Sequence, residues 1–291
     1  MKKTIYLLIL LSFKFSFSQR ISGKIKDSIV NEPIAYVNMV LLNHNIGAYS
    51  DENGFYKIDI QHHFNDTLKV SALGYEPKLI SLKKFKNEKS INLNFNLKTN
   101  TIDLDEIVLS NSKTKYSKKI KLGLEREGNI GVSSLIGHEY CVLIKNPSNI
   151  EGKLKSVIID LKRRANADYI ADLRIKVYTY DVNLKKPGSN LINKNIIVSP
   201  KNGKYSLKVD LTDYNILFTK NGLCIGAEWI DIRNETKKYD KIGPTLRYTY
   251  TNEELLSWTN YQNRGWKNGI MEYKNNKKAK PIMGIEILIQ K

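Results

Sequence analysis

Short runs in which apolar and polar residues alternate recur along almost the whole chain, and this pattern limits the fold most. Every second residue is apolar in residues 91–97, and Leu173, Ile175 and Val177 repeat this pattern in residues 173–180, which places one face of an extended strand against a core. Turn-forming sequences such as Pro187-Gly188 and Asn202-Gly203 separate such runs. The pattern therefore predicts an all-β protein built from sandwiches of short strands.

The chain has 291 residues, and at about 100–200 residues per domain this length indicates two domains. Its first 18 residues have a basic start at Lys2-Lys3, an apolar run, and the small residues Ser16 and Ser18 before the expected cut. They are typical of a secretory signal peptide. We therefore expect an exported protein that is periplasmic, associated with the outer membrane or extracellular, without a transmembrane span after cleavage.

Residues 19–110 are expected to form a sandwich of seven strands. The turn signals place these strands at residues 21–26, 35–42, 47–49, 55–60, 67–72, 77–82 and 91–97. Residues 47–49 and 55–60 flank Asp51–Gly54, where Asp51 and Asn53 can form local hydrogen bonds and Gly54 can adopt a positive φ. We expect these two strands to form a hairpin.

Residues 111–121 contain five lysines, whose mutual repulsion predicts an extended linker. Residues 122–291 are again all-β in pattern and suggest a larger, jelly-roll-like sandwich. Its expected strands are residues 139–145, 152–162, 173–180, 195–199, 205–210, 222–230, 245–250 and 282–289.

Several motifs of the first domain resemble the carboxypeptidase-regulatory-like domain of exported Bacteroidetes proteins. They are Gly23 with Ile25 and Asp27, Pro33-Ile34, residues 50–56 and Leu73-Gly74-Tyr75. The resemblance implies a transthyretin-like sandwich that serves as an accessory module without catalytic residues. Residues 104–109 are similar to the segment after this domain in TonB-dependent receptors, but the chain is too short for a 22-stranded barrel. Some segments of the second domain, such as residues 174–178, faintly resemble jelly-roll modules of exported Bacteroidetes proteins.

The positive charge lies in the second half of the chain. Residues 20–111 hold 11 Lys and Arg against 11 Asp and Glu, whereas residues 112–291 hold 33 against 18, a net charge of +15. This excess is consistent with attraction to an anionic surface such as lipopolysaccharide phosphate, acidic polysaccharide or anionic lipid. A solvated lysine-rich surface without a partner is the alternative. Nucleic acid is not expected as a partner, because export separates the chain from it.

No metal, cofactor or nucleophile motif stands out. The four histidines lack Cys or carboxylate neighbours at ligand spacing, and no Gly-x-Ser-x-Gly sequence occurs. Cys141 and Cys224 lie in apolar runs. They could form one disulfide in an oxidising compartment or remain two buried thiols, and the sequence leaves this open.

The best candidate for a binding site is the segment of residues 258–266, where aromatic, amide and guanidinium groups alternate. Flat rings stack on the C–H faces of sugars, and amide and guanidinium groups bind sugar hydroxyls. The alternative is that the tryptophans complete the core. The predicted site residues are Trp258, Tyr261, Asn263, Arg264 and Trp266.

These observations favour a non-enzymatic binding or accessory protein of the cell envelope that recognises a glycan or another envelope component. Polysaccharide, lipopolysaccharide and an outer-membrane protein are the partners considered. One alternative is a hydrolase with catalytic carboxylates in the second domain, for which Glu228, Asp231 and Asp240 are candidates. Another is a structural protein that acts through protein–protein contact.

Overall fold

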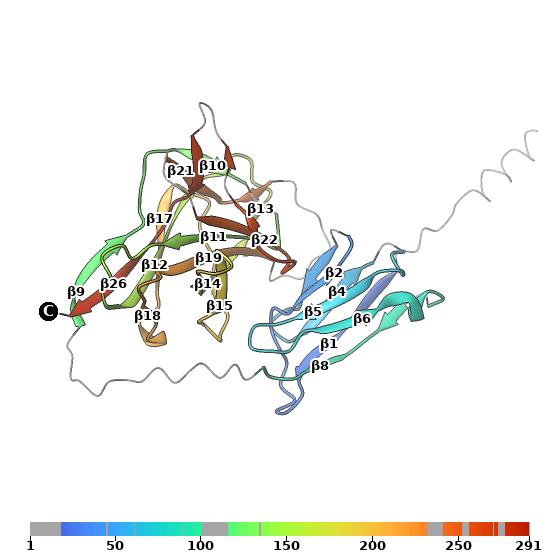
Figure 1. Ribbon diagram of the computed structural model, residues 1–291. Helices are drawn as coiled ribbons and strands as arrows, with labels where there is room; N and C mark the ends of the chain where they lie inside the picture. The colour runs from blue at the N-terminus through green and yellow to red at the C-terminus, as the bar shows by residue number, and fades with distance from the viewer. Residues whose placement is uncertain are drawn as a thin grey trace, which may run out of the picture.

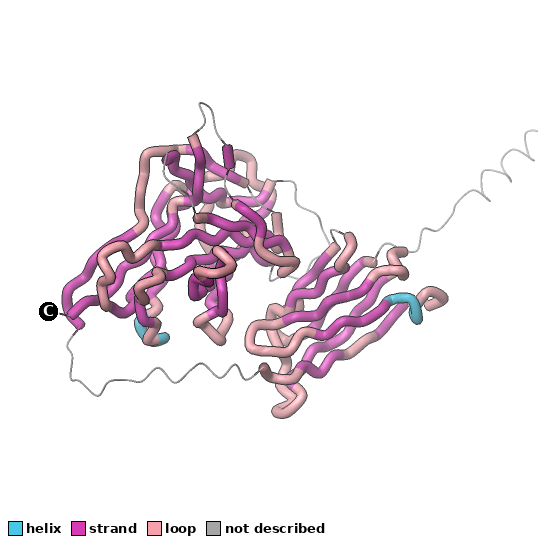
Figure 2. Tube along the Cα trace, in the orientation of Figure 1, coloured by secondary structure: helices cyan, strands magenta, loops and turns pink. Residues whose placement is uncertain are grey.

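The computed structural model describes residues 19–290, apart from residues 45, 61, 89, 101–115, 134, 232–240, 252–255, 270 and 273–276. In this part of the chain strands dominate, and the helices are two short 3-10 turns, η1 (Leu82–Phe85) and η2 (Thr212–Tyr214) (Figure 2). The predicted all-β class is confirmed. The described residues include no helix with the length and apolar character needed to cross a membrane. The predicted signal peptide, residues 1–18, lies outside them.

The first domain consists of two small sheets packed face to face. One has the order β4 (Phe55–Asp59), β1 (Arg20–Asp27) and β7 (Ser90–Asn92), with β8 (Phe95–Leu97) also paired to β1. The other has the order β3 (Gly47–Tyr49), β2 (Asn38–Leu41), β5 (Thr67–Ser71) and β6 (Lys78–Ser81). The inward-facing residues of both sheets form one core, which includes Ile21, Ile25, Met39, Leu41, Ile58, Leu68, Val70 and Ile91.

The turn at residues 51–54 forms locally as expected, but the predicted hairpin is wrong. β3 pairs with β2, whereas β4 pairs with β1 in the opposite sheet. The Asp51 carboxylate accepts hydrogen bonds from the N–H groups of Asn53 and Phe55 at 2.9 Å each. Gly54 has a φ of 75°, and a Cβ there would lie 2.5 Å from the Ile25 carbonyl oxygen. The turn therefore carries the chain from one sheet to the other.

Residues 91–97, predicted as one strand, form the two strands β7 and β8. Both run parallel to β1, and the break between them falls at Leu93 and Asn94. The Leu93 N–H donates to the Ser22 carbonyl and the Lys24 N–H donates to the Asn94 side-chain oxygen, both at 2.8 Å. These two bonds hold the irregular residues against β1, so the alternation of the sequence continues across the break.

The second domain consists of a nine-stranded and a seven-stranded sheet. The nine-stranded sheet follows the order β24 (Met271–Glu272), β25 (Lys278–Pro281), β21 (Thr245–Thr251), β12 (Gly152–Lys162), β26 (Met283–Gln290) and β9 (Tyr116–Leu122). Three further strands complete it: β10 (Ile130–Val132) pairs with β21, and β17 (Tyr205–Asp210) and β18 (Leu217–Phe218) pair with β12.

The seven-stranded sheet follows the order β15 (Lys186–Asn190), β14 (Asp172–Asp181), β19 (Leu223–Ile230), β11 (His138–Ile144), β22 (Ser257–Tyr261) and β23 (Lys267–Asn268). β16 (Ile196–Val198) also pairs with β14, and β13 (Tyr169–Ile170) and β20 (Ile242–Gly243) form a small separate pair. The large core between the two sheets includes Leu154, Val157, Ile159, Ile175, Val177, Ile225, Trp229, Tyr248, Ile285 and Ile287.

Residues 116–121, predicted as the end of the lysine-rich linker, belong instead to strand β9. This strand pairs with β26 from Tyr116 to Leu122. Ile120 and Leu122 pack against the core, while Lys119 and Lys121 are exposed. The alternation of lysine with apolar residues was therefore a strand signal that the high lysine content concealed. The rest of the predicted linker, residues 111–115, lies outside the described residues.

The first domain lies beside the seven-stranded sheet of the second domain, and β9 and β26 lie on the side away from it (Figure 1). Several hydrogen bonds cross between the domains, such as the one from the Tyr49 hydroxyl to Glu228. The second domain therefore has one outer face that meets the first domain and another that does not.

Candidate functional site

The predicted segment at residues 258–266 divides between two environments. Trp258 lies on β22 and is only 7% exposed, packed in a small cluster with Cys141, Cys224 and Tyr178. Trp266 is half-buried against the same cluster, and its ring meets that of Tyr178 edge-on at 5.4 Å. Both cysteines are buried and free. The two tryptophans are thus brought together, mainly as packing groups on the outer face of the seven-stranded sheet.

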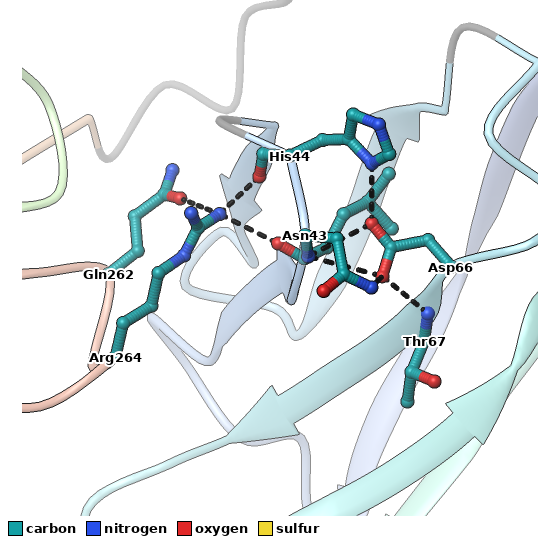
Figure 3. A network of polar contacts seen from close by, with 7 residues as sticks. Asn43, His44, Asp66, Thr67, Gln262 and Arg264 are labelled. Carbon is teal, nitrogen blue, oxygen red and sulfur yellow. Dashed lines mark hydrogen bonds and ion pairs between the residues drawn. The ribbon is translucent and has the colours of Figure 1, made fainter.

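Of the other predicted residues, Tyr261 ends β22, and Asn263 and Arg264 lie in the loop that follows and contacts the first domain. Arg264 Nη2 donates to the carbonyl oxygens of Leu41, at 2.7 Å, and His44 (Figure 3). The Lys69 ammonium of the first domain donates to the Asn263 carbonyl at 3.0 Å. The half-buried Tyr261 ring lies 5.7 Å from the Arg264 guanidinium carbon. The assignment of these residues to a sugar site stays a prediction.

The first-domain side of this contact is held in place by Asp66. Its carboxylate accepts hydrogen bonds from the Asn43 N–H and from the Thr67 N–H, and it contacts His44 Nδ1 at 2.6 Å (Figure 3). These bonds fix the loop whose carbonyl groups receive Arg264.

Gly47 allows the second domain to approach β3 closely. A Cβ on this residue would lie 2.3 Å from Gln262 Nε2, so any larger residue would force the Gln262 side chain to move.

A cluster of buried charges lies beneath the first domain, on strands β11, β14 and β19. We call it the interdomain cluster; it comprises Glu139, Arg174, Lys176 and Glu228 with the hydroxyls of Tyr49 and Tyr178. Lys176 Nζ lies 2.9 Å from Glu139 Oε2 and 3.0 Å from Glu228 Oε2. Two carboxylates thus share two cations, as buried charges require.

Contacts from the first domain complete this cluster. The Tyr49 hydroxyl donates to Glu228 Oε1 at 2.6 Å, and Arg174 Nη2 donates to the Tyr36 carbonyl at 2.8 Å. Arg174 Nη1 lies 3.5 Å from Glu228 Oε2. The Tyr178 hydroxyl, from the second domain itself, donates to Glu139 Oε1 at 2.7 Å. Each carboxylate is therefore bonded both to a cation and to a phenol.

The two carboxylates differ in their pKa values. Burial would raise the pKa of Glu228, but the nearby charges of Lys176 and Arg174 outweigh burial and lower it to about 2. At Glu139 burial prevails, and the pKa lies above its ordinary value although Lys176 opposes this. Divergent carboxyl pKa values occur in acid–base sites, but Glu228 is only 3% exposed. A substrate could not reach it while the first domain is docked.

The remaining candidates for a catalytic carboxylate do not join this cluster. Asp231 accepts a hydrogen bond from the Tyr169 hydroxyl at 2.9 Å, and Asp240 lies outside the described residues.

A polar pocket of about 180 Å³ opens on the outer face of the nine-stranded sheet. We call it the Asp160 pocket, and its lining residues are Arg126, Asp160, Leu161, Lys204, Tyr205, Ser206 and Arg247. Two nitrogens of Arg126 donate to the two Asp160 carboxylate oxygens at 2.7 and 3.1 Å. Ser206 Oγ donates to Oδ1 at 2.6 Å, and Arg247 Nη1 lies 3.5 Å from Oδ2. Two arginines therefore hold the carboxylate, and Lys204 also lines the pocket.

Burial alone would raise the pKa of Asp160. The hydrogen bonds from Arg126 and Ser206 outweigh burial and hold this pKa below its ordinary value. The carboxylate is therefore ionised at neutral pH, and the pocket carries a net positive charge.

A second group of charges lies on the same face, where β9, β12, β17 and β26 adjoin. We call it the Glu286 cluster; it comprises Lys119, Lys121, Lys155, Lys208, Asp210 and Glu286. Lys208 Nζ lies 3.0 Å and Lys155 Nζ 3.7 Å from Glu286 Oε1. Lys121 is opposite Glu286 in the β9–β26 pairing. Four lysines thus accompany two carboxylates.

Sequence reasoning found the excess of positive charge but neither of these groups. The compact basic run that the sequence displays, Lys162-Arg163-Arg164, takes no part in them: Lys162 Nζ donates to the Asn129 carbonyl at 2.6 Å. The two groups are assembled from strands far apart in the chain, so no local motif could have revealed them.

Residues 21–109 match the model of the CarboxypepD_reg-like domain family, which confirms the resemblance inferred from the motifs of the first domain. No family model covers the rest of the chain. A comparison with the curated proteins gave no significant match.

Among solved structures, the cysteine protease and lectin-like domains of Cwp84, a surface-layer-associated protein of Clostridium difficile, are similar at 12% identity and a TM-score of 0.36. The match covers 84% of this chain and 52% of that one, so the chain spans about half of its length. A putative carbohydrate-binding protein from Bacteroides uniformis matches at 12% identity and a TM-score of 0.20, over 79% of this chain and 98% of that one.

Proposed function

We propose that the chain is an exported, non-enzymatic binding protein of the cell envelope, and that its second domain holds an anionic envelope component. The outer face of the nine-stranded sheet is the binding surface. The observation that carries this proposal is the Asp160 pocket, in which Arg126 and Arg247 pair with a single carboxylate and Lys204 adds a third positive charge to the lining.

The charges around this pocket support an anionic ligand. Arginine presents a planar fork of donors that suits carboxylate and phosphate groups. Lys204 is exposed at the rim of the pocket. An anionic group that enters would meet more positive than negative charge, and the net charge of +15 over residues 112–291 would attract it from a distance.

A binding assay with a panel of polymers tests this proposal. We expect the intact chain to bind lipopolysaccharide or the acidic polysaccharide polygalacturonate, and not the neutral polysaccharide dextran. At about 0.1 M salt, interactions between exposed charges that are more than about 10 Å apart are largely screened. Binding should therefore weaken steeply as salt is added.

Paired variants locate the surface. Replacing Lys204 and Lys208 by Gln should weaken binding several-fold, whereas the same change at the exposed Lys57 and Lys78 of the first domain should leave it unchanged. Equal binding of dextran, or equal loss with both pairs of variants, would overturn the proposal.

The predicted sugar site at residues 258–266 is a second candidate. Trp266 is only half-buried and Asn263 is exposed, so an aromatic and an amide group remain near the surface there. Binding of a neutral polysaccharide that is lost in Trp266→Ala would support this site. Absence of such binding in the unaltered chain would dismiss it.

A further inference from the structure

The Asp160 pocket and the Glu286 cluster adjoin the same face of the nine-stranded sheet, and strand β12 passes through both. Ser156 of β12 is opposite Glu286 in β26 and Asp210 in β17. Asp160 follows four residues later and is opposite Ser206 in β17. At about 3.3 Å per residue along a strand, the two groups are about 13 Å apart.

Each group has more positive than negative charge at short range. In the Glu286 cluster, Lys119 and Lys155 are close enough to interact directly, and this contact between like charges lowers the pKa of Lys119. In the Asp160 pocket, both arginines lie beside the same carboxylate. An added anionic group would relieve repulsion in either place.

Both groups are open to a partner from outside. The side chains of Lys208 and Arg126 are 47% and 43% exposed, and β9, β26 and β12 lie on the side of the second domain away from the first (Figure 1). A partner could therefore contact both groups at once without displacing the first domain.

We propose that the two groups together bind a single linear acidic polysaccharide, which places one anionic group at the Asp160 pocket and another at the Glu286 cluster. This inference rests on the proposed function and specifies its ligand. The bound anionic groups are separated by more than one sugar residue. Once the first is bound, the second binds at a high effective concentration, so the affinity exceeds that of either group alone.

A flexible polymer fits this arrangement better than a flat membrane surface. The side chain of Asp160 is only 4% exposed and that of Arg247 only 17%, so this pair is recessed in the pocket, whereas Arg126, at 43%, reaches the surface. A charged group on a protruding sugar can enter such a pocket. The headgroups of a planar bilayer would instead meet the exposed lysines around it.

A chain-length series of galacturonate oligomers, from the monomer to the octamer, tests this inference on the intact protein. We expect the affinity per molecule to rise about 100-fold once an oligomer is long enough to reach both groups. Lys204→Gln in the pocket and Lys119→Gln with Lys208→Gln in the cluster should each abolish this rise while retaining the weak binding of short oligomers. Lys57→Gln should retain the rise.

The outcomes separate this inference from the proposed function. An affinity that grows only in proportion to the number of charges would overturn the two-group inference and leave the anionic ligand intact. Binding to vesicles of anionic lipid but not to any oligomer would overturn the inference that the ligand is a polysaccharide and would indicate a membrane surface instead. Absence of binding to every anionic probe would overturn both.

Discussion

The two outer faces of the second domain carry charges of different kinds. On the seven-stranded sheet, Glu139 and Glu228 share Arg174 and Lys176 beneath the first domain, and all four side chains are buried. On the nine-stranded sheet, cations outnumber carboxylates and many are exposed. Buried charges must be paired because water no longer solvates them. An unpaired excess of charge is tolerated only where solvent or a partner reaches it, which agrees with a structural role for the first face and with the binding role that we propose for the second.

The largest expected effect is that of Lys176→Met. This change leaves Glu139 and Glu228 buried without the ammonium that lies within 3.0 Å of both. Removal of one partner from a buried ion pair costs about 3–5 kcal/mol. Urea denaturation should show a loss of that size in the free energy of unfolding. A loss below about 1 kcal/mol would mean that the carboxylates readily find other partners.

The pH dependence of stability should reveal Glu228 itself. Its pKa in the folded protein, about 2, lies below the ordinary value of 4.5, so in acid the unfolded chain binds its proton first. The stability due to Glu228 is therefore complete above about pH 4.5 and is lost as the pH falls towards 2. In Glu228→Gln the free energy of unfolding should no longer fall in this way between about pH 4.5 and 2. Urea denaturation at a series of pH values would measure the difference.

The same variant separates structure from catalysis. If Glu228 were a catalytic acid, Glu228→Gln would abolish a hydrolytic activity that the unaltered chain shows on a panel of polysaccharides. We expect no such activity in either protein.

A smaller effect is expected for Tyr49→Phe, which removes one hydroxyl between the domains. This hydroxyl donates to the ionised Glu228 at 2.6 Å, and hydrogen bonds to charged groups contribute about 1.5–3 kcal/mol. We expect the loss to appear as weaker docking, with the two domains unfolding at separate urea concentrations. Tyr56→Phe is the matched control, because its hydroxyl donates to the Leu93 carbonyl within the first domain.

The smallest effect is expected for Lys208→Met, the counterpart of Lys176→Met on the other face. Lys208 is 47% exposed although it lies 3.0 Å from Glu286 Oε1. Exposed ion pairs contribute about 0–1 kcal/mol, so the urea midpoint should hardly change. A loss equal to that of Lys176→Met would erase the distinction between the two faces.

Much of the strand structure could be predicted, because alternation records which residues face a core. The segments 152–162 and 205–210 were expected as strands and coincide with β12 and β17. Pairing was harder to predict: the turn at Asp51 forms as expected, yet β3 and β4 enter different sheets. A turn motif specifies local hydrogen bonds but not the partner that each strand finds later.

The candidate sites were harder still. Trp258 and Arg264 are close in sequence and chemically suited to a sugar, but the fold places one in an apolar cluster and directs the other to the first domain. Lys119, Lys155 and Lys208 converge from three strands. Their proximity depends on register, which the composition of the chain does not reveal.

The position of β26 between β12 and β9 has a consequence for the order of folding. Residues 283–290 are synthesised after every other described strand, yet they join two strands that were made much earlier. The nine-stranded sheet therefore cannot be completed before residues 283–290 have been synthesised. Such distant pairings also make folding slow, so we expect this sheet to be completed late and its earlier strands to be vulnerable to proteolysis until then.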